Sequence, residues 1–372
     1  MRIAYAISTL KRSGPVNVLH ELVRQAANRG AHVTIITLSP EPLQSRAEDF
    51  QRLGATLVPL NLHRFWGLPM LASAFLEAVR ASRPDVLHTH CFRTDLLSAL
   101  TCRGSIPSIT TLHNDPFEDY AFRFGPIMGT AVALAHIAIA RRLDRAAALN
   151  RHLAKKFARM GVPAIAIPNG IDADLFYEPP RKQLSSPSAV LTGHLSVRKD
   201  PLTMLDALPV RDLATTFVGN GPLLQKARSE VSRRRLDVTF AGRQANIRPW
   251  LKRASIFVSC SRSEGLPLAV LEALAANLFC VLSDIPAHRE IAARFPDNTI
   301  LFETGNHRSL ASALSDACSA TPEHLTRELF RATPYSNMSM GRDYFAAYLD
   351  LAPQPLEQNR QPAKRNRRHH AI

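Results

Sequence analysis

Short β-rich runs alternate with helical patterns along most of this chain, and this alternation strongly limits the folds open to it. Apolar runs such as R-I-A-Y-A-I-S-T-L (2–10) and D-V-L-H-T-H (85–90) have the character of buried strands. Helical patterns such as Val16–Arg29 and Thr94–Cys102 follow them. Strands separated by helices of roughly fifteen residues indicate a parallel sheet with right-handed crossovers. We therefore predict an α/β fold.

The alternation occurs twice, on either side of a segment rich in Pro and Ser. This segment, Y-E-P-P-R-K-Q-L-S-S-P-S (177–188), lacks apolar periodicity and predicts a linker. A chain of 372 residues also exceeds what one hydrophobic core normally covers. We expect two doubly wound, Rossmann-like domains facing a central cleft. The predicted segments are a first domain (1–176), the linker (177–188), a second domain (189–335), a helix crossing back to the first domain (336–352) and a basic, disordered tail (353–372).

The formal net charge of +15 is high, although the charged share of 21% is ordinary. Such an excess favours an anionic partner: nucleic acid, an acidic membrane surface or a phosphorylated substrate. The basic segment 141–159 follows the apolar tract Gly125–Ala140, so the two could rest on anionic lipid headgroups, with a solvated basic face as the alternative. Nucleic-acid binding is disfavoured because Phe157 is the only aromatic residue of this basic segment.

Cysteine usage and hydropathy favour a cytoplasmic protein, peripheral on the inner face of the plasma membrane if it contacts lipid. The five cysteines are scattered and form no C-x-x-C pair, which argues against disulfides and a zinc site. The tract Gly125–Ala140 is too short to span a bilayer, and the apolar run 3–10 is too short for a signal peptide.

The stretch R-S-E-G-L-P-L-A-V-L-E-A-L (262–274) directly follows a predicted strand. Pro267 suits the first position of a helix, which places Glu264 in the preceding loop and Glu272 further inside the helix. Free amides at a helix start prepare an anion site, and carboxylates beside it suit sugar hydroxyls. Alternatively, Glu264 caps the helix and Glu272 lies on a solvated face.

Two further loops of the second domain follow predicted strands. T-G-H-L-S-V-R-K-D-P (192–201) gathers His194, Arg198 and Lys199 before a helix that Asp200 can cap, and Lys199 offers a point charge to phosphate. A merely solvated basic loop is the alternative. V-G-N-G-P-L (218–223) carries two glycines that permit close backbone approach to a ligand, which is a weak signal alone.

In the first domain, three features lie where a cleft would be. Ser13-Gly14-Pro15 has the position of a phosphate loop without its glycine pattern. His113 ends a predicted strand, although a lone histidine is often structural. Asp172 and Asp174 form a D-x-D, for which a turn is the better interpretation than a metal site.

Together these stretches resemble the retaining glycosyltransferases of the GT-B fold, which use nucleotide-sugar donors. The resemblance covers about Arg2 to Leu351, and its last motif is the E-x7-E pattern of that family. The matching motifs are S-G at 13–14, His113, P-N-G-I-D at 168–172, G-H-L-S-V-R-K-D at 193–200, V-G-N-G-P-L at 218–223, F-A-G at 240–242 and E-G-L-P-L-A-V-L-E at 264–272.

The resemblance implies roles for the E-x7-E segment. Glu264 is expected to hold the hydroxyls of the donor sugar, and Glu272 those of the ribose. The amides expected to help Glu264 are those of Gly265, Leu266 and Leu268.

It also implies roles for the loops facing this segment. Lys199 would neutralise the diphosphate, with the Gly14 loop closing over it, and His113 would contact the transferring sugar. The family usually has Arg where this chain has His194, which offers fewer donors; Arg198 is the candidate to compensate for this.

The expected function is a retaining hexosyltransferase acting from a nucleotide diphosphate sugar onto a glycan or lipid-linked acceptor, in cell-surface polysaccharide or lipopolysaccharide assembly. Gly242 and Arg243 would line the base pocket, and His113, Lys199 and Glu264 would be catalytic. No cofactor and no metal ion are expected. The alternatives are another GT-B enzyme (a sugar-nucleotide epimerase or a phosphorylase) and a non-catalytic basic binding protein on a degenerate GT-B fold.

Overall fold

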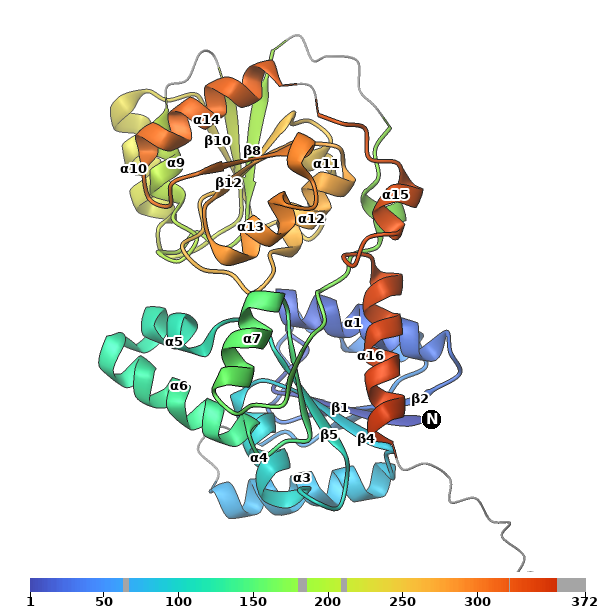
Figure 1. Cartoon of the computed structure of the whole chain (residues 1–372). Coiled ribbons are helices and arrows are strands. Elements are labelled where there is room, and N and C mark those ends of the chain that lie inside the picture. The colour runs from blue at the N-terminus through green and yellow to red at the C-terminus, as the bar shows by residue number, and fades with distance from the viewer. Residues whose placement is uncertain (63–66, 180–185, 209–212, 321, 353–372) are drawn as a thin grey trace, which may run out of the picture.

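Seven parallel strands form the first sheet of the computed structural model, in the order β3-β2-β1-β4-β5-β6-β7 (Figure 1). The structure describes residues 1–372 except 63–66, 180–185, 209–212, 321 and 353–372. The middle of the expected linker and the whole expected tail therefore lie outside the described residues. The strands are β1 (Arg2–Ile7), β2 (His32–Thr37), β3 (Thr56–Pro59), β4 (Val86–His90), β5 (Ser108–Leu112), β6 (Arg145–Ala148) and β7 (Ala164–Ala166).

Helices cover both faces of this sheet. Because every paired strand runs parallel, each connection must cross over the sheet, and most crossovers are helical. The first helix begins at Gly14, two residues earlier than expected. The helices are α1 (Gly14–Ala27), α2 (Ala47–Arg52), α3 (Leu68–Ser82), α4 (Phe92–Thr101), α5 (Pro116–Phe124), α6 (Pro126–Ala140) and α7 (Arg151–Arg159). The short helix α8 (Ala173–Phe176) follows them in the chain but packs on the second domain.

Six parallel strands form the second sheet, in the order β10-β9-β8-β11-β12-β13. The strands are β8 (Ser188–Thr192), β9 (Ala214–Val218), β10 (Val238–Gly242), β11 (Ile256–Ser259), β12 (Phe279–Ser283) and β13 (Thr299–Phe302). The helices are α9 (Pro201–Ala207), α10 (Leu224–Arg234), α11 (Arg248–Leu251), α12 (Leu268–Ala275), α13 (Pro286–Ala292), α14 (His307–Ser319), α15 (Arg327–Arg331) and α16 (Asn337–Leu351), with a 3₁₀ turn at Pro296–Asn298. Two parallel-sheet α/β domains confirm the predicted fold class.

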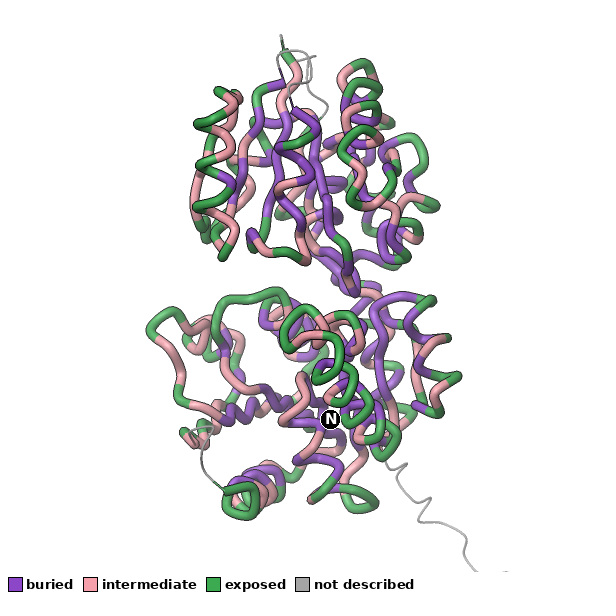
Figure 2. The backbone as a smooth tube through the Cα atoms, turned by 90° about the vertical axis from the view of Figure 1, so that its left-hand side faces the viewer, coloured by how far each residue is buried: buried purple, intermediate pink, exposed green. Residues whose placement is uncertain are grey.

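The buried backbone lies in the two sheets and the helix faces against them (Figure 2). One core of the second domain gathers Phe257, Val270 and Leu274, all nearly inaccessible to solvent. The core of the first domain gathers side chains such as Tyr5 and Phe50. Each sheet therefore buries its apolar side chains independently.

Helix α16 belongs to the second half of the sequence but packs on the first domain (Figure 1). Met340, Tyr344 and Tyr348 are buried in the same core as Tyr5. Gly341 is needed there, since a Cβ at this position would lie 2.7 Å from Gln25 Cγ. The chain therefore crosses between the domains twice, and α16 ties the second crossing to the first sheet.

The basic segment 141–159 does not form one continuous surface face. Its middle enters the first sheet as β6, whose alanines are buried. Its end forms α7, which buries Leu153 and Phe157. The apolar tract before it forms α6, which packs against α5 and keeps an exposed outer face.

Candidate active site

Glu264 stands in the loop after β11 and is held by three side chains. Its Oε2 lies 3.0 Å from Arg198 Nη1, its Oε1 accepts from Ser261 Oγ at 2.7 Å, and Lys199 Nζ forms an ion pair with Oε1. The Glu264 side chain is 6% exposed. Burial would raise its pKa, but the charges of Lys199 and Arg198, with hydrogen bonds from Lys199 and Ser261, lower that pKa from 4.5 to about 2. Glu264 is therefore a carboxylate at neutral pH.

Sheet order brings Lys199 and Glu264 together, although 65 positions separate them. Strands β8 and β11 are neighbours, so the loops that follow them lie side by side at the carboxyl edge of the sheet. Arg198 Nη1 also donates to the carbonyl of Ser263 at 2.7 Å, and the amide of Arg262 donates to the carbonyl of Arg198 at 2.8 Å. The two loops therefore form one bonded unit, and the solvated-loop alternative is wrong for Arg198 and Lys199.

Asp200 stands at the start of α9, but its carboxylate does not cap that helix. Asp200 Oδ2 accepts from Thr203 Oγ1 at 2.9 Å and pairs with Arg262 Nη2 at 2.8 Å. The expected cap is therefore wrong. The Asp200 carboxylate instead adds a further bond between the β8 and β11 loops.

Glu272 lies in α12 and has the opposite pKa shift to Glu264. Burial raises its pKa from 4.5 to about 7, and the charge of Lys199 opposes this only in part. The helix begins at Leu268, one residue later than expected, because Pro267 is extended and its carbonyl accepts from the Val270 amide at 3.1 Å. Within one motif, the two carboxyl groups therefore differ in charge near neutral pH.

The two glycines of V-G-N-G-P-L lie where two loops pack closely together. A Cβ on Gly219 would lie 1.8 Å from the carbonyl oxygen of Gly193, and one on Gly221 would lie 2.4 Å from that of Leu195. The amide of Leu195 donates to the carbonyl of Asn220 at 3.0 Å, which fixes this contact. Both glycines are therefore needed for close approach between two backbones.

His113 follows β5 and lies at the junction of the two domains. Its carbonyl oxygen is so close to Gly265 that a Cβ there would lie 1.9 Å away. Its Nε2 lies 3.1 Å from Nδ1 of His90. Burial lowers the pKa of His113 to about 4, with a small opposing effect of Asp95. The ring is therefore neutral at neutral pH.

Two asparagines of the first domain hold the Gly265 peptide, and sequence reasoning missed both. The Gly265 amide donates to Asn114 Oδ1 at 3.2 Å, and Asn150 Nδ2 donates to the Gly265 carbonyl at 2.6 Å. Asn150 Oδ1 also caps α7 by accepting from Leu153 N at 2.7 Å. The Gly265 amide is therefore not free, contrary to expectation. Within the described residues, the amides of Leu266 and Leu268 have no hydrogen-bond acceptor.

Asp119 is a third residue that the sequence did not reveal. Asn114 Nδ2 donates to Asp119 Oδ1 at 3.3 Å, so one side chain links Asp119 to Gly265. Burial raises the pKa of Asp119, Arg198 and Arg123 lower it, and Glu264 raises it. The carboxyl of α5 is therefore electrostatically coupled to the second domain. Its position in N-D-P-F-E-D gives no periodic or motif signal.

Within the described part of the chain, the remaining expected site residues form no hydrogen bond or ion pair with Glu264, and their surroundings differ. Gly14 begins α1 in open space, and His194 is exposed. Leu266 is buried, and Leu268 packs against cores of both domains. Gly242 ends β10 with a positive φ of 68°.

Arg243 reaches the first domain instead of enclosing a pocket within the second. Its Nη1 donates to Gln44 Oε1 at 3.3 Å and its Nη2 donates to the carbonyl of Arg12 at 3.1 Å. The Arg243 side chain therefore bridges the loop after β10 and the loop before α1.

The D-x-D of Asp172 and Asp174 forms a turn held by arginines. Asp172 Oδ1 accepts from the Asp174 amide at 3.1 Å and caps α8, and its Oδ2 pairs with Arg24 at 2.9 Å. Asp174 pairs with Arg331. Among the described residues, no group of three or more His, Cys, Asp or Glu side chains could hold a metal ion.

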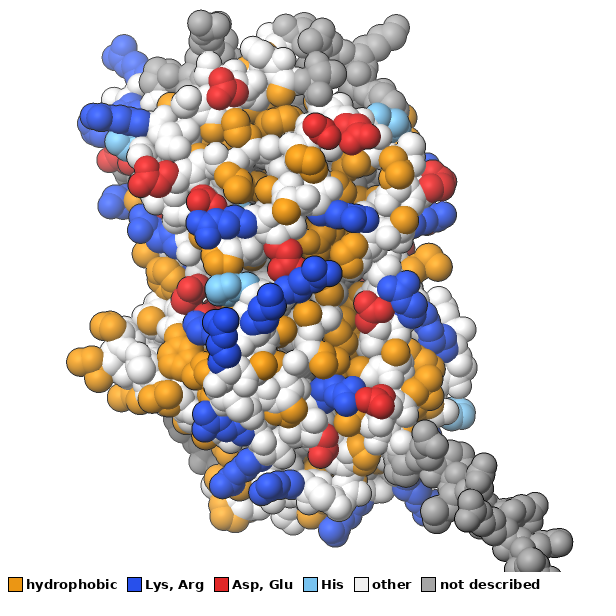
Figure 3. Space-filling view, viewed as in Figure 1, with side chains coloured by type: hydrophobic (Ala, Val, Ile, Leu, Met, Phe, Trp, Pro, Cys, Tyr) orange, Lys and Arg blue, Asp and Glu red, His pale blue; other side chains and the backbone are white. Residues whose placement is uncertain are grey.

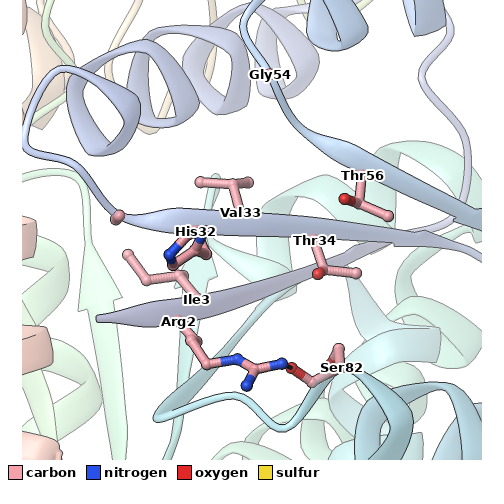
Figure 4. A pocket seen from close by; sticks show the side chains of 9 residues that line it. Arg2, Ile3, His32, Val33, Thr34, Gly54, Thr56 and Ser82 are labelled. Carbon is pink, nitrogen blue, oxygen red and sulfur yellow. Dashed lines mark hydrogen bonds between the residues drawn. The ribbon is translucent and has the colours of Figure 1, made fainter.

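The cavity that touches Glu264 is small. It encloses about 40 Å³ and is lined by residues of both domains, among them Glu118, Asn150 and Ser263. A larger hollow of about 510 Å³ lies at the amino-terminal ends of β1, β2 and β3, where Arg2, His32 and Thr56 line it (Figure 4). That hollow is at the opposite edge of the sheet from His113.

Two family models match the chain. Residues 12–175 match Glycosyltransferase Family 4, and residues 186–319 match Glycosyl transferases group 1, so together they cover most of the sequence. The chain belongs to the glycosyltransferases. One model covers each α/β domain, which agrees with a site built between them.

Curated relatives of this glycosyltransferase act in bacterial polysaccharide assembly. TuaC of Bacillus subtilis, described as a teichuronic acid biosynthesis glycosyltransferase, is 29% identical over 59% of this chain, and the match spans only 59% of TuaC. The O-antigen biosynthesis glycosyltransferase WclY of Escherichia coli is 25% identical over 85% of this chain and 89% of WclY. The GDP-mannose:cellobiosyl-diphosphopolyprenol alpha-mannosyltransferase of Xanthomonas campestris is 25% identical over 81% of this chain and 83% of its own length.

Solved structures confirm the GT-B fold of this glycosyltransferase. Sucrose-phosphate synthase from Thermosynechococcus elongatus superposes with a TM-score of 0.77 at 17% identity, covering 94% of this chain and 99% of that one. Anabaena HepE, solved in complex with UDP and glucose, superposes with a TM-score of 0.77 at 16% identity, covering 94% and 100%.

None of the helices within the described residues is long and apolar enough to cross a bilayer.

Proposed function

We propose that this glycosyltransferase transfers a hexose from a nucleotide diphosphate sugar and retains its anomeric configuration. The observation that carries the proposal is the cluster of Lys199, Arg198 and Glu264 at the carboxyl edge of the second sheet, in the segment that contacts His113. Two cations suit a diphosphate, and a carboxylate suits sugar hydroxyls. The UDP and glucose bound by HepE, and the GDP-mannose named for the Xanthomonas relative, support a nucleotide-sugar donor.

Donor binding exchanges the partners of this cluster. Lys199 and Arg198 leave Glu264 for the phosphate oxygens, and Glu264 then accepts hydrogen bonds from the sugar. When the bond between the anomeric carbon and the diphosphate oxygen breaks, the electron pair stays on the diphosphate. The two cations stabilise that developing charge, and the sugar gains positive character.

Other expected site residues orient the rest of the donor. Glu272 takes the ribose hydroxyls, and the Gly14 amide closes over the diphosphate from the start of α1. Gly242 and Arg243 border the base, where Arg243 already joins the two domains. His194 stands where the family has an arginine. Arg198, which lies beside Lys199, provides the positive charge of that arginine.

Retention follows from attack on the face that the diphosphate leaves. The acceptor hydroxyl oxygen forms the new bond to the anomeric carbon, and its proton passes to an oxygen of the departing diphosphate. The products are a glycoside and a nucleoside diphosphate. Lys199 and Arg198 supply the positive charge that a divalent ion would otherwise provide, so turnover should be unchanged in excess EDTA.

The proposed acceptor is a glycan or lipid-linked glycan in cell-surface polysaccharide or lipopolysaccharide assembly, met at the cytoplasmic face of the membrane. The diphosphopolyprenol acceptor named for the Xanthomonas relative and the O-antigen role named for WclY support this. The outer face of α6 also suits lipid, because it exposes side chains such as Ile127 (87% exposed) and Leu134 (54%). Hydrophobic side chains gather on this side of the first domain (Figure 3). Arg141 and Arg142 follow that face and suit anionic headgroups.

The decisive experiment is turnover of a nucleotide-sugar panel by the wild type, Lys199→Ala and Glu264→Ala. Each variant should lose at least about 100-fold in kcat/KM, because each removes an interaction with developing charge or with the sugar. Lys252→Ala is the matched control, since Lys252 forms an exposed ion pair with Glu178. Full activity in both site variants, or no donor turnover by the wild type, would contradict the proposal.

Membrane contact is tested separately by flotation with vesicles of phosphatidylglycerol and of phosphatidylcholine. The wild type should float with the anionic vesicles, and Ile127→Ser with Leu134→Ser should reduce the floated fraction. Leu329→Ser is the matched control, since Leu329 is an exposed leucine of the second domain. Equal flotation of both variants would exclude the α6 face as the lipid contact.

A further inference from the structure

A row of aromatic rings runs from the core of the first domain to His113. His88 stacks on His90 with ring centroids 4.2 Å apart, and His90 stacks on His113 at 5.3 Å. His88 is fixed from both sides, by Tyr348 at Nδ1 (2.7 Å) and by Thr111 at Nε2 (2.8 Å). The row is therefore rigid up to His90, the ring that directly contacts His113.

One proton lies between His90 and His113. Burial lowers the pKa of both rings, so at neutral pH each ring is neutral and carries a single N–H. His90 Nδ1 and His113 Nε2 are 3.1 Å apart, so one donates and the other accepts. In one arrangement His90 donates from Nδ1, and His113 carries its proton on Nδ1. In the other, His113 donates from Nε2, and His90 carries its proton on Nε2.

The surroundings of His90 Nε2 distinguish the two arrangements. Within the described residues this atom is buried without a hydrogen-bond partner. If His113 donated, His90 would carry its proton on Nε2, and that N–H would be buried without an acceptor, which is rare in proteins. The rings of His88, Tyr5 and His113 lie at 27°, 33° and 26° to His90, so none presents its face to an in-plane N–H.

We infer that His90 is a positioning residue that donates from Nδ1 to His113 Nε2 and thereby fixes His113 as its Nδ1–H tautomer. Within the described residues His113 Nδ1 has no partner, and it is not one of the enclosed unpaired atoms, so it can meet a ligand. His113 then offers the site a hydrogen-bond donor and no basic nitrogen. Its contact with the donor sugar rests on the proposed function, whereas the tautomer itself does not.

Long-range proton–nitrogen NMR on histidine-labelled wild-type protein tests the tautomer without any variant or substrate. The expected result is His113 protonated on Nδ1 and His90 protonated on Nδ1. Protonation of His113 on Nε2 would overturn the inference, whatever the activity of the protein.

Variants then test whether His90 fixes the tautomer of His113. His90→Phe keeps a stacked ring without a donor, so His113 should lose its single tautomer and kcat/KM should fall about tenfold. His90→Asn places an amide N–H near the former Nδ1, and should restore the tautomer and most of the activity. His88→Phe is the control: it removes two buried hydrogen bonds and should lower Tm while leaving the proton of His113 on Nδ1. An unchanged tautomer in His90→Phe, or an altered one in His88→Phe, would overturn the inference.

Discussion

The second domain presents a charged cluster of Lys199, Arg198 and Glu264 to the cleft, whereas the first domain presents a neutral row ending in His113. Ion pairs hold the charged cluster, so a charged ligand can take over its partners. Ring stacking and neutral hydrogen bonds hold the histidine row, and burial keeps its rings uncharged. Under the proposed function, the second domain would respond to the donor, while the first would provide a fixed surface for the sugar.

Gly265 is where the segment of the charged cluster contacts His113. Substituting it is therefore the strongest test of the difference between the two domains. In Gly265→Ala the new Cβ would lie 1.9 Å from the His113 carbonyl oxygen, and both partners are backbone atoms that must separate. Because small misplacements of reacting groups are costly, kcat/KM should fall about 100-fold or more.

Activity assays with small-angle scattering check this. The radius of gyration should rise in Gly265→Ala and stay unchanged in Gly67→Ala, whose Cβ would make only an ordinary 3.8 Å contact with Pro69. If kcat/KM of Gly265→Ala fell by less than about threefold and its radius of gyration did not change, the close contact between Gly265 and His113 would not be needed for activity.

Glu264→Gln tests the charged cluster through the pH dependence of protein stability. The folded pKa of Glu264 is about 2, below its ordinary 4.5, so the carboxylate stabilises the fold above pH 4.5 and this stabilisation is lost as pH falls towards 2. At pH 7 the variant should be less stable by about 3 kcal/mol. Denaturant unfolding at pH 3 and 7 measures this; equal losses at both pH values would contradict it.

Glu272→Gln should have a smaller effect of opposite sign. The folded pKa of Glu272 is raised from 4.5 to about 7, so its contribution to stability is present below pH 4.5 and is lost as pH rises through 7. The variant removes that loss and should be more stable than the wild type at pH 8, by about 2 kcal/mol because a partly exposed group is screened. If Glu272→Gln were less stable than the wild type at pH 8, burial would not disfavour the charged form of Glu272.

Much of the architecture was predictable, since strands and helices follow local apolar periodicity. The helix Asn337–Leu351 has the predicted bounds, and the pairing of Lys199 with Glu264 follows from loops of neighbouring strands. The basic segment 141–159 could not be interpreted from charge alone, because charge does not show that its alanines form the buried strand β6. The expected cap at Asp200 was wrong. A helix start predicts such a cap, but the Asp200 carboxylate pairs with Arg262 instead of with the helix backbone.

The sequence by itself determined the two sheets, the family motifs and the residue types at the cleft, because these depend on local pattern and on strand order. Only the tertiary structure decided the ionisation of Glu264 and Glu272, the partners of Gly265 and the contact of His90 with His113. Those properties depend on burial and on distances between segments far apart in the chain. Two glutamates of one motif therefore have different pKa values because one lies beside two cations and the other lies buried with little compensation.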